Sequence, residues 1–157
     1  MPYRFELYIA KANELVNELA AELGFPTEKE RTVRILRAVL HGLRDNMPVQ
    51  ESLQLLSQLP MIVKALYVDG WSLKKNRRKA RKKQEFIEDV ISHDPKTVEH
   101  DFTMSSDSVG SIISVTLRVL GRYISEGEKK DIVAVMPSGL RPYIEESFRP
   151  RPVLISV

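Results

Sequence analysis

Apolar residues recur at helical spacing along most of this chain. From Tyr3 to Leu23 they stand three or four positions apart, which is typical of a helix with one buried face. Gly24 follows and is suited to end that helix, because glycine adopts the left-handed conformation found at many helix ends. The same spacing predicts further helices in these segments: Val33–Leu43, Leu55–Leu59, Val63–Tyr67, Phe86–Ile91, Val109–Tyr123 and Leu140–Phe148.

The two halves of the chain share one framework of positions. When the sequence is shifted by 77 residues, many apolar residues of the first half align with apolar residues of the second. The aligned pairs include Leu43 with Leu120, Glu51 with Glu128, Leu55 with Ile132, and Pro60 with Pro137. This internal similarity predicts two copies of one helical unit.

Residues 109–123 fit two patterns. Val115 and Leu117 alternate with polar neighbours, as they would in a strand, whereas Ile112 and Leu120 belong to a helical stripe. The matching segment of the first half has a clear helical pattern. The repeat therefore favours a helix here, and a central sheet through this segment would contradict the prediction.

The sequence thus predicts an all-α fold, a helical bundle of about eight helices built from two pseudo-repeated units. We expect one domain over residues 1–146. Unit one covers about residues 3–67, a basic linker about 68–83, and unit two about 84–146. Residues 147–157 are expected to form an extended tail, because its prolines cannot continue a helix.

A turn rich in carboxylates joins two helices of the second unit. Ser125 and Glu128 fit a capping box, in which the serine hydroxyl and the glutamate carboxylate each accept a backbone N–H of the other residue. The pair Glu126 and Glu128 also fits a catalytic interpretation. Capping is favoured because it explains Ser125 and Glu128 together, and Pro137 is then suited to open the next helix.

The net charge of +3 is unevenly distributed. Ten consecutive positions hold eight of the 24 basic residues, which we call the basic stripe: Lys74, Lys75, Arg77, Arg78, Lys79, Arg81, Lys82 and Lys83. The remaining 16 basic residues face 21 acidic ones, so the rest of the chain carries −5. The sequence therefore predicts a mildly acidic globule with one strongly basic segment.

Composition excludes several classes of protein. The chain has no cysteine, so disulfides and thiolate metal sites are absent and a reducing compartment is favoured. No apolar run approaches the ~20 residues that a membrane-spanning helix needs, and the first residues lack the pattern of a signal peptide. We expect a cytoplasmic protein.

Several short segments resemble the domain-of-unknown-function 2267 family, a bacterial and archaeal family of all-helical domains. The resemblance rests on these segments: Tyr67–Trp71, Glu85–Phe86, Ile124–Glu128, Asp131–Ile132, Met136–Pro137 and Leu140–Arg141. It covers about residues 4–146 and implies helical architecture and a prokaryotic, cytoplasmic origin. It implies no activity and no catalytic residues. The dense basic stripe departs from the family pattern.

The remaining candidate chemistry is sparse. The three histidines lack the spacing of a zinc-protease helix, and no glycine-rich phosphate loop is present. The segment from His93 to Asp101 holds five oxygen or nitrogen ligands, which suggests either a solvated polar loop or a surface site for a divalent cation. The loop interpretation is favoured. We expect no catalytic residue, no cofactor and no metal, and we lean away from an enzyme.

Three functions remain. The first is a binding or scaffolding module whose basic stripe contacts nucleic acid or an anionic membrane surface, without sequence preference because no aromatic residue interrupts the stripe. The second is a small-molecule sensor or enzyme with a pocket between the two units near Trp71 and Tyr67. Packing of Trp71 over the core beside the Asp-Gly turn is the favoured interpretation of this residue, and stacking on a ligand is the alternative. The third is a structural homo-oligomer that uses the C-terminal tail as an exchange arm.

Overall fold

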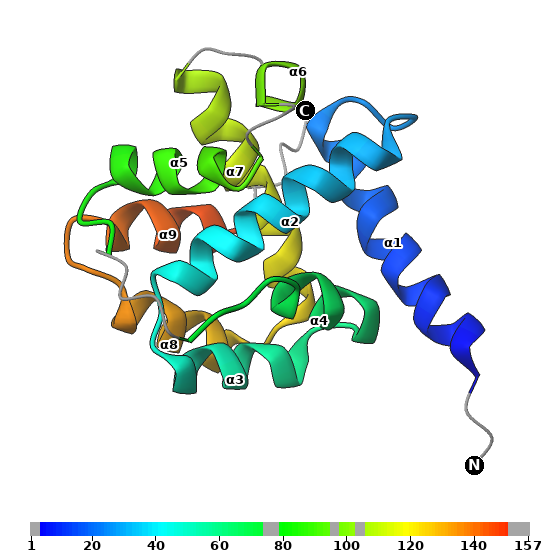
Figure 1. Ribbon diagram of the computed structural model, residues 1–157, viewed down its shortest axis with the longest axis horizontal. Helices are drawn as coiled ribbons and strands as arrows, with labels where there is room; N and C mark the ends of the chain where they lie inside the picture. The colour runs from blue at the N-terminus through cyan, green and yellow to red at the C-terminus, as the bar shows by residue number, and fades with distance from the viewer. Residues whose placement is uncertain (1–3, 74–78, 95–97, 103–105, 151–157) are drawn as a thin grey trace, which may run out of the picture.

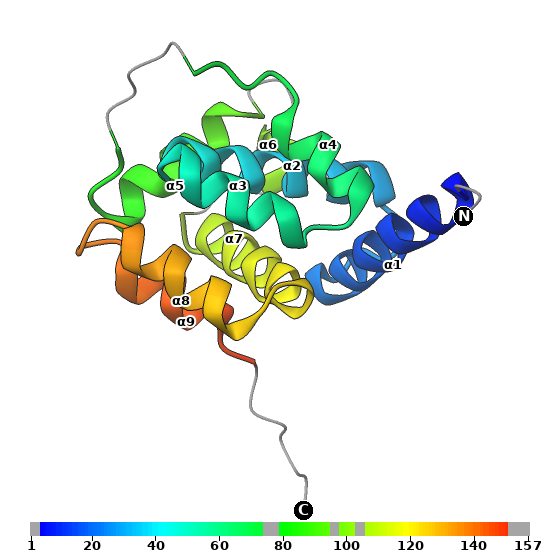
Figure 2. The same cartoon turned by 90° about the horizontal axis from the view of Figure 1, so that it is seen from below.

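The computed structural model describes residues 4–73, 79–94, 98–102 and 106–150, and within them it contains only helices (Figures 1 and 2). This confirms the all-α prediction, with nine α-helices in these ranges where about eight were expected. The helices are α1 (Phe5–Leu23), α2 (Lys29–Asp45), α3 (Val49–Gln58), α4 (Met61–Val68), α5 (Lys83–Ser92), α6 (Val98–Phe102), α7 (Ser106–Leu120), α8 (Glu126–Val135) and α9 (Arg141–Phe148), with a 3-10 turn at Gly121–Tyr123.

Helices α2 and α7 form the centre of the bundle. They contact each other, and both contact α1, α5 and α6, while α4 lies on α2 and α9 lies on α7. One continuous apolar core runs between them and includes Leu36 and Leu40 from α2 and Ile113 and Leu117 from α7, all fully buried. The ambiguous segment is thus a helix, as the repeat predicted.

The N-terminal half of α1 projects from this bundle (Figures 1 and 2). Phe5, Leu7 and Ile9 are more than half exposed there, whereas Leu15 and Leu19 of the same helix are fully buried. An exposed apolar face of this kind is what a homo-oligomer would bury. The homo-oligomer stays a prediction, and its proposed exchange arm, residues 151–157, lies outside the described residues.

Element boundaries follow the predicted repeat closely. Helix α3 covers residues 49–58 and α8 covers residues 126–135, so both ends differ by 77. Helix α2 begins at Lys29 and α7 at Ser106, again 77 residues apart. These offsets support two copies of one unit, and the repeat and its division of the chain stay predictions.

Two boundaries near the C-terminus differ from the sequence-based expectation. Pro137 does not open the last helix, because the backbone N–H groups of Leu140 and Arg141 both bind the Pro137 carbonyl in a turn and α9 begins at Arg141. The tail also begins later than predicted. Helix α9 continues to Phe148, because burial of Ser147 and Phe148 against the core holds its last turn in place.

Within the ranges that the structure describes, no helix combines the length and the apolar character needed to cross a bilayer.

Candidate functional site

One face of α2 carries polar side chains that point toward the end of α4. Arg37, His41, Arg44 and Asp45 stand at spacings of four, three and one, which places them along a single face of the helix. The opposite face supplies apolar residues to the core. A polar stripe on an otherwise buried helix needs partners, and the end of α4 provides them.

The side chains of α2 hold the last carbonyl groups of α4. Arg44 Nη1 donates to the carbonyl oxygens of Tyr67, at 2.8 Å, and Asp69, at 2.9 Å. His41 Nε2 donates to the carbonyl oxygen of Leu66 at 2.8 Å. The last carbonyls of a helix have no partners within it, so these bonds fix the chain as it leaves α4. Gly70 then turns it with a φ of 69°, a conformation that glycine adopts without strain.

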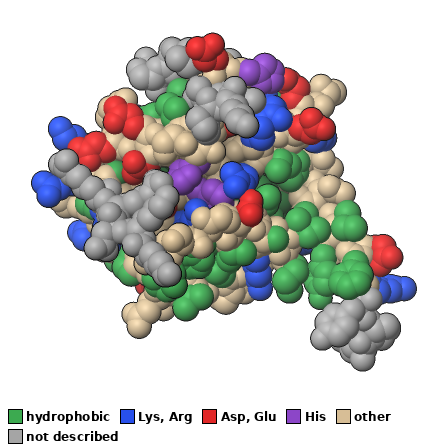
Figure 3. Space-filling model, viewed as in Figure 1, with side chains coloured by type: hydrophobic (Ala, Val, Ile, Leu, Met, Phe, Trp, Pro, Cys, Tyr) green, Lys and Arg blue, Asp and Glu red, His purple; other side chains and the backbone are tan. Residues whose placement is uncertain are grey.

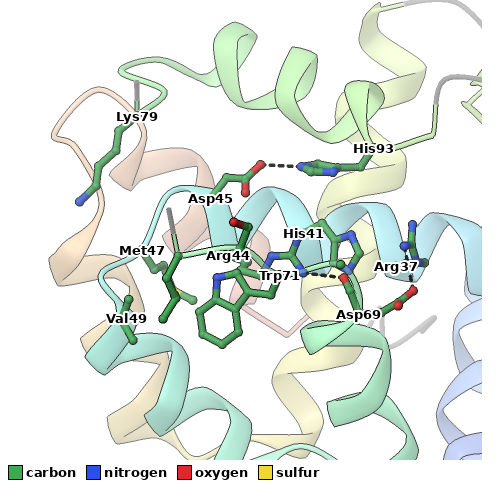
Figure 4. A pocket seen from close by; sticks show the side chains of 13 residues that line it. Arg37, His41, Arg44, Asp45, Met47, Val49, Asp69, Trp71, Lys79 and His93 are labelled. Carbon is green, nitrogen blue, oxygen red and sulfur yellow. Dashed lines mark hydrogen bonds and ion pairs between the residues drawn. The ribbon is translucent and has the colours of Figure 1, made fainter. Parts of the chain in front are cut away.

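An open cleft of about 390 Å³ lies between this face of α2 and the segment that follows α4 (Figure 4). Its apolar wall consists of Trp71, Met47, Val49 and Leu73, and its other side is the polar face of α2. Figure 4 shows Arg37 and Lys79 at opposite ends, with Trp71 and His41 between them. The cleft is within the usual size range for small-ligand sites.

Of the two residues that were expected to form a ligand pocket, only Trp71 lines the cleft. Trp71 is half-buried in the wall of the cleft. Tyr67 does not line it, because its side chain is fully buried behind Trp71 and its hydroxyl lies 2.6 Å from Ser52 Oγ. The two rings meet edge to face with their centroids 5.8 Å apart. Burial raises the pKa of Tyr67, and its role is to support the indole.

The acidic groups of the cleft already have basic partners. Asp69 Oδ2 accepts from Arg37 Nη2 at 2.9 Å, and Asp45 Oδ2 accepts from His93 Nε2 at 2.5 Å. Lys79 is exposed at the rim. Three permanent cations, including Arg44, therefore face two carboxylates across the lining. In Figure 3, histidine side chains are visible between basic and acidic ones in the middle of this face.

His41 is the most perturbed titratable group of the cleft. Burial lowers its pKa to about 4, and the charges of Arg44 and Arg37 act in the same direction. The ring of His93 stands nearly perpendicular to it, with 5.3 Å between centroids. His41 is therefore neutral at pH 7, with its Nε2 proton committed to the backbone of α4.

The structure describes only the second half of the basic stripe, which begins at this cleft. Lys74, Lys75, Arg77 and Arg78 lie outside the described residues, while Leu73 and Lys79 both line the cleft. Lys79, Arg81 and Lys82 are exposed and precede α5, so this part of the stripe is not helical.

Two contacts position the described end of the stripe. Ala80 is buried, and its N–H donates to Asn46 Oδ1 at 2.7 Å, which anchors the segment to the end of α2. Lys83 differs from the other basic residues, because its Nζ lies 4.9 Å from the ring centroid of Tyr143. The ammonium group of Lys83 thus forms a cation–π contact within the protein.

The candidate metal ligands between His93 and Asp101 have separate partners in the structure. His93 binds Asp45, whereas His100 Nδ1 lies 3.0 Å from Asp101 Oδ1. The fully buried Asp101 carboxylate accepts two hydrogen bonds from Arg34, at 2.9 and 3.1 Å. His93 and Asp101 are therefore each bound to a residue of α2, Asp45 and Arg34 respectively.

The predicted capping box is half right. Ser125 Oγ accepts the N–H of Glu128 at 3.1 Å, as expected. The predicted bond from the N–H of Ser125 to the Glu128 carboxylate is wrong, because this N–H donates to Gln58 Oε1 at 2.6 Å. The Glu128 carboxyl turns inward to Glu51, and burial, together with Glu51, raises its pKa to about 8.

Over the residues that the structure describes, fold and site together define a helical domain with a polar cleft bounded by an indole. The sequence model of the family described as uncharacterized conserved protein (DUF2267) matches residues 12–143. The chain belongs to this family, as the resemblance of its motifs indicated. No curated protein matches the sequence.

Sequence reasoning found Trp71 but missed the α2 face opposite it. The spacing of Arg37, His41, Arg44 and Asp45 is visible in the sequence as a polar stripe on an apolar helix. That pattern is equally typical of a solvated helix face. Only the position of α4, some 25 residues further along the chain, makes it the floor of a cleft.

Proposed function

We propose that this protein is a binding module that holds a small organic anion in the cleft beside Trp71. The observation that carries the proposal is that an indole and an exposed guanidinium, that of Arg37, line the same open cleft. The indole offers a flat apolar surface, and the guanidinium offers planar donors suited to carboxylate or phosphate. We assign no reaction to the site.

The state of the cations supports an anionic ligand. Among the described contacts, Arg37 binds Asp69 through Nη2 alone, so most of its five N–H groups remain for a ligand. Arg44 and His41 are used to hold α4, which makes the floor rigid before a ligand arrives. The adjacent basic stripe adds positive potential that attracts an anion.

Trp71 provides a direct assay, because it is the one tryptophan in the sequence. We would titrate the full-length protein with adenosine monophosphate and with benzoate and follow tryptophan emission. Adenosine and inorganic phosphate would serve as half-ligands. Saturable quenching by at least one organic anion is expected, with the half-ligands at least tenfold weaker because each engages only one side of the cleft.

A matched pair of variants distinguishes binding by the cleft from a general effect of the protein's net charge. Arg37→Gln should weaken binding about tenfold, the scale of one lost charge-assisted hydrogen-bond pair. Arg122→Gln removes the same charge from a remote exposed residue that pairs with Glu18 and Glu22, and it should leave binding unchanged. Absence of saturable quenching with all probes, or equal loss in both variants, would contradict the proposal.

A second candidate function is polyanion binding by the basic stripe. It is favoured by the exposure of Lys79, Arg81 and Lys82, which form no ion pair with another described residue. Eight basic residues in ten positions produce a strong local field. This charge favours nucleic acid and anionic membranes as partners. The test is how strongly the binding affinity depends on the salt concentration.

A further inference from the structure

Three carboxylates meet where α3 contacts α8. Glu51 comes from α3, and Glu128 and Asp131 come from one face of α8. One oxygen from each lies within 4.8 Å of the oxygens of the other two. Among the described residues, no other group of three histidine, aspartate or glutamate side chains gathers this closely. The cluster shares no lining residue with the Trp71 cleft.

The two glutamates are buried without the partners that buried carboxylates require. Glu51 is 7% exposed and Glu128 is 4% exposed. Glu51 Oε2 and Glu128 Oε1 are enclosed and accept no hydrogen bond. A buried polar atom in this state costs about 1–3 kcal/mol, and more when it is charged. The site therefore presents enclosed acceptor atoms that lack a positive or donating partner.

The neighbouring lysine does not supply that partner. Lys129 follows Glu128 in the sequence, but its Nζ lies 2.5 Å from Glu126 Oε1 instead. No described lysine or arginine forms an ion pair with Glu51, Glu128 or Asp131. Since like charges this close repel strongly at low dielectric, the cluster needs either a bound proton or a cation to offset its charge.

We propose that Glu51, Glu128 and Asp131 bind one divalent cation of the calcium type between α3 and α8. Calcium takes oxygen ligands at about 2.3–2.6 Å, so two oxygens on one ion can stand up to about 5.2 Å apart. The separations in the cluster fall within this limit. Asp131 is exposed and gives the ion a route from solvent, where water completes its coordination.

Asp131 decides between a cation and a shared proton. A single proton between Glu51 and Glu128 would neutralise one charge and would leave Asp131 without a function in the cluster. A divalent ion uses all three side chains. Glu51 and Glu128 also lie in the first turns of their helices, where the helix dipole favours the ionised carboxylates that a metal requires. The ion would join the two halves of the chain at the α3–α8 contact.

The test is thermal unfolding of the full-length protein after treatment with EGTA, with and without added Ca²⁺, Mg²⁺ or Mn²⁺. Ca²⁺ at 100 times its Kd should raise the Tm by about 5–10 °C. Isothermal titration should give one site per chain. If none of the three ions changes the Tm, the proposal is overturned and the pair holds a proton instead.

Variants assign the effect to these residues. Glu51→Gln should lose the Ca²⁺-dependent shift and be at least as stable as the wild type in EGTA, because a buried like charge is removed. Glu126→Gln is the matched control, since that carboxylate is 81% exposed and only two residues from Glu128, and it should keep the full shift. Equal shifts in wild type and Glu51→Gln would overturn the proposal. Should Glu51→Gln fail to fold, Asp131→Asn at the exposed side of the cluster must weaken Ca²⁺ binding at least tenfold.

Discussion

Glu51 and Glu128 each occupy the third position of a helix, α3 and α8, and their carboxyl oxygens lie within 4.8 Å of each other. They are also a pair that the 77-residue offset aligns. In a two-fold arrangement, equivalent side chains meet at the axis. Helices α2 and α7, which the same offset aligns, contact each other as well. The pairing therefore supports a pseudo-two-fold relation between the two predicted units.

Loss of the Ser125 cap should destabilise the protein without affecting anion binding in the Trp71 cleft. Ser125→Ala removes the acceptor of the Glu128 N–H, and we expect a cost of about 1 kcal/mol in the free energy of unfolding. Chemical denaturation measures it. Gln58→Ala should also cost stability, because Gln58 rather than Glu128 holds the N–H of Ser125. If Gln58→Ala were neutral and anion binding disappeared in Ser125→Ala, this turn would be a binding site.

Acidification should destabilise the fold through His41. The folded-state pKa of about 4 is below the unfolded value of 6.5, so the unfolded chain binds more protons between these values and stability falls as the pH falls. From pH 7 to pH 5 this effect amounts to about 2 kcal/mol. Arg37, Arg44 and His93 surround the ring and oppose its protonation. Urea denaturation across this pH range measures the slope.

Two histidine variants identify the source of that slope. His41→Gln retains an N–H donor for the Leu66 carbonyl but cannot titrate, so its stability should be lower at pH 7 and flatter toward pH 5. His100→Gln makes the same substitution at a histidine whose side chain is 61% exposed and forms no described hydrogen bond to α4, so it serves as the comparison variant. A wild-type slope that persists unchanged in His41→Gln would assign the acid sensitivity to other groups.

The helices could be predicted because each has an apolar face of its own. The periodicity of α1 or α2 is a local property, and the repeat resolved the ambiguous segment that became α7. Asp69 and Gly70 indicate a turn beside Trp71, which made this residue a candidate for packing over the core or, alternatively, for contacting a ligand. Local patterns of this kind are sufficient for fold class and for one wall of the cleft.

The other wall depended on contacts that no local pattern contains. Arg44 and Asp69 meet across 25 residues of sequence, and their bond converts a polar helix face into a cleft floor. Tyr67 was a candidate for the pocket together with Trp71, yet its side chain is fully buried, whereas Trp71 beyond the end of α4 is half-buried. Glu128 was interpreted from its neighbours alone, whereas its partner Glu51 lies on another helix.

The basic stripe should bind nucleic acid through phosphate contacts that salt weakens. We expect about four to six contacts, because eight charges in ten residues cannot all reach one backbone. The slope of a log–log plot against salt should be about −0.9 per phosphate. Binding to duplex DNA should therefore weaken by about two to three orders of magnitude from 50 to 200 mM salt. Random and defined sequences should bind alike, since phosphate contacts do not read bases. Fluorescence anisotropy with labelled duplexes measures both.

A variant that neutralises five residues tests the assignment, with glutamine in place of Arg77, Arg78, Lys79, Arg81 and Lys82. Binding should be lost, while the circular dichroism spectrum and Tm change little, because exposed charges contribute little to stability. Lys83 is left intact because it packs on Tyr143, and its loss would confuse folding with binding. If the wild type binds neither DNA, RNA nor anionic vesicles at 50 mM salt, the stripe does not bind polyanions. Anion binding at Trp71 would then depend on the cleft alone, and the five-residue variant would leave the tryptophan titration with an organic anion almost unchanged, apart from the contribution of Lys79 at the rim.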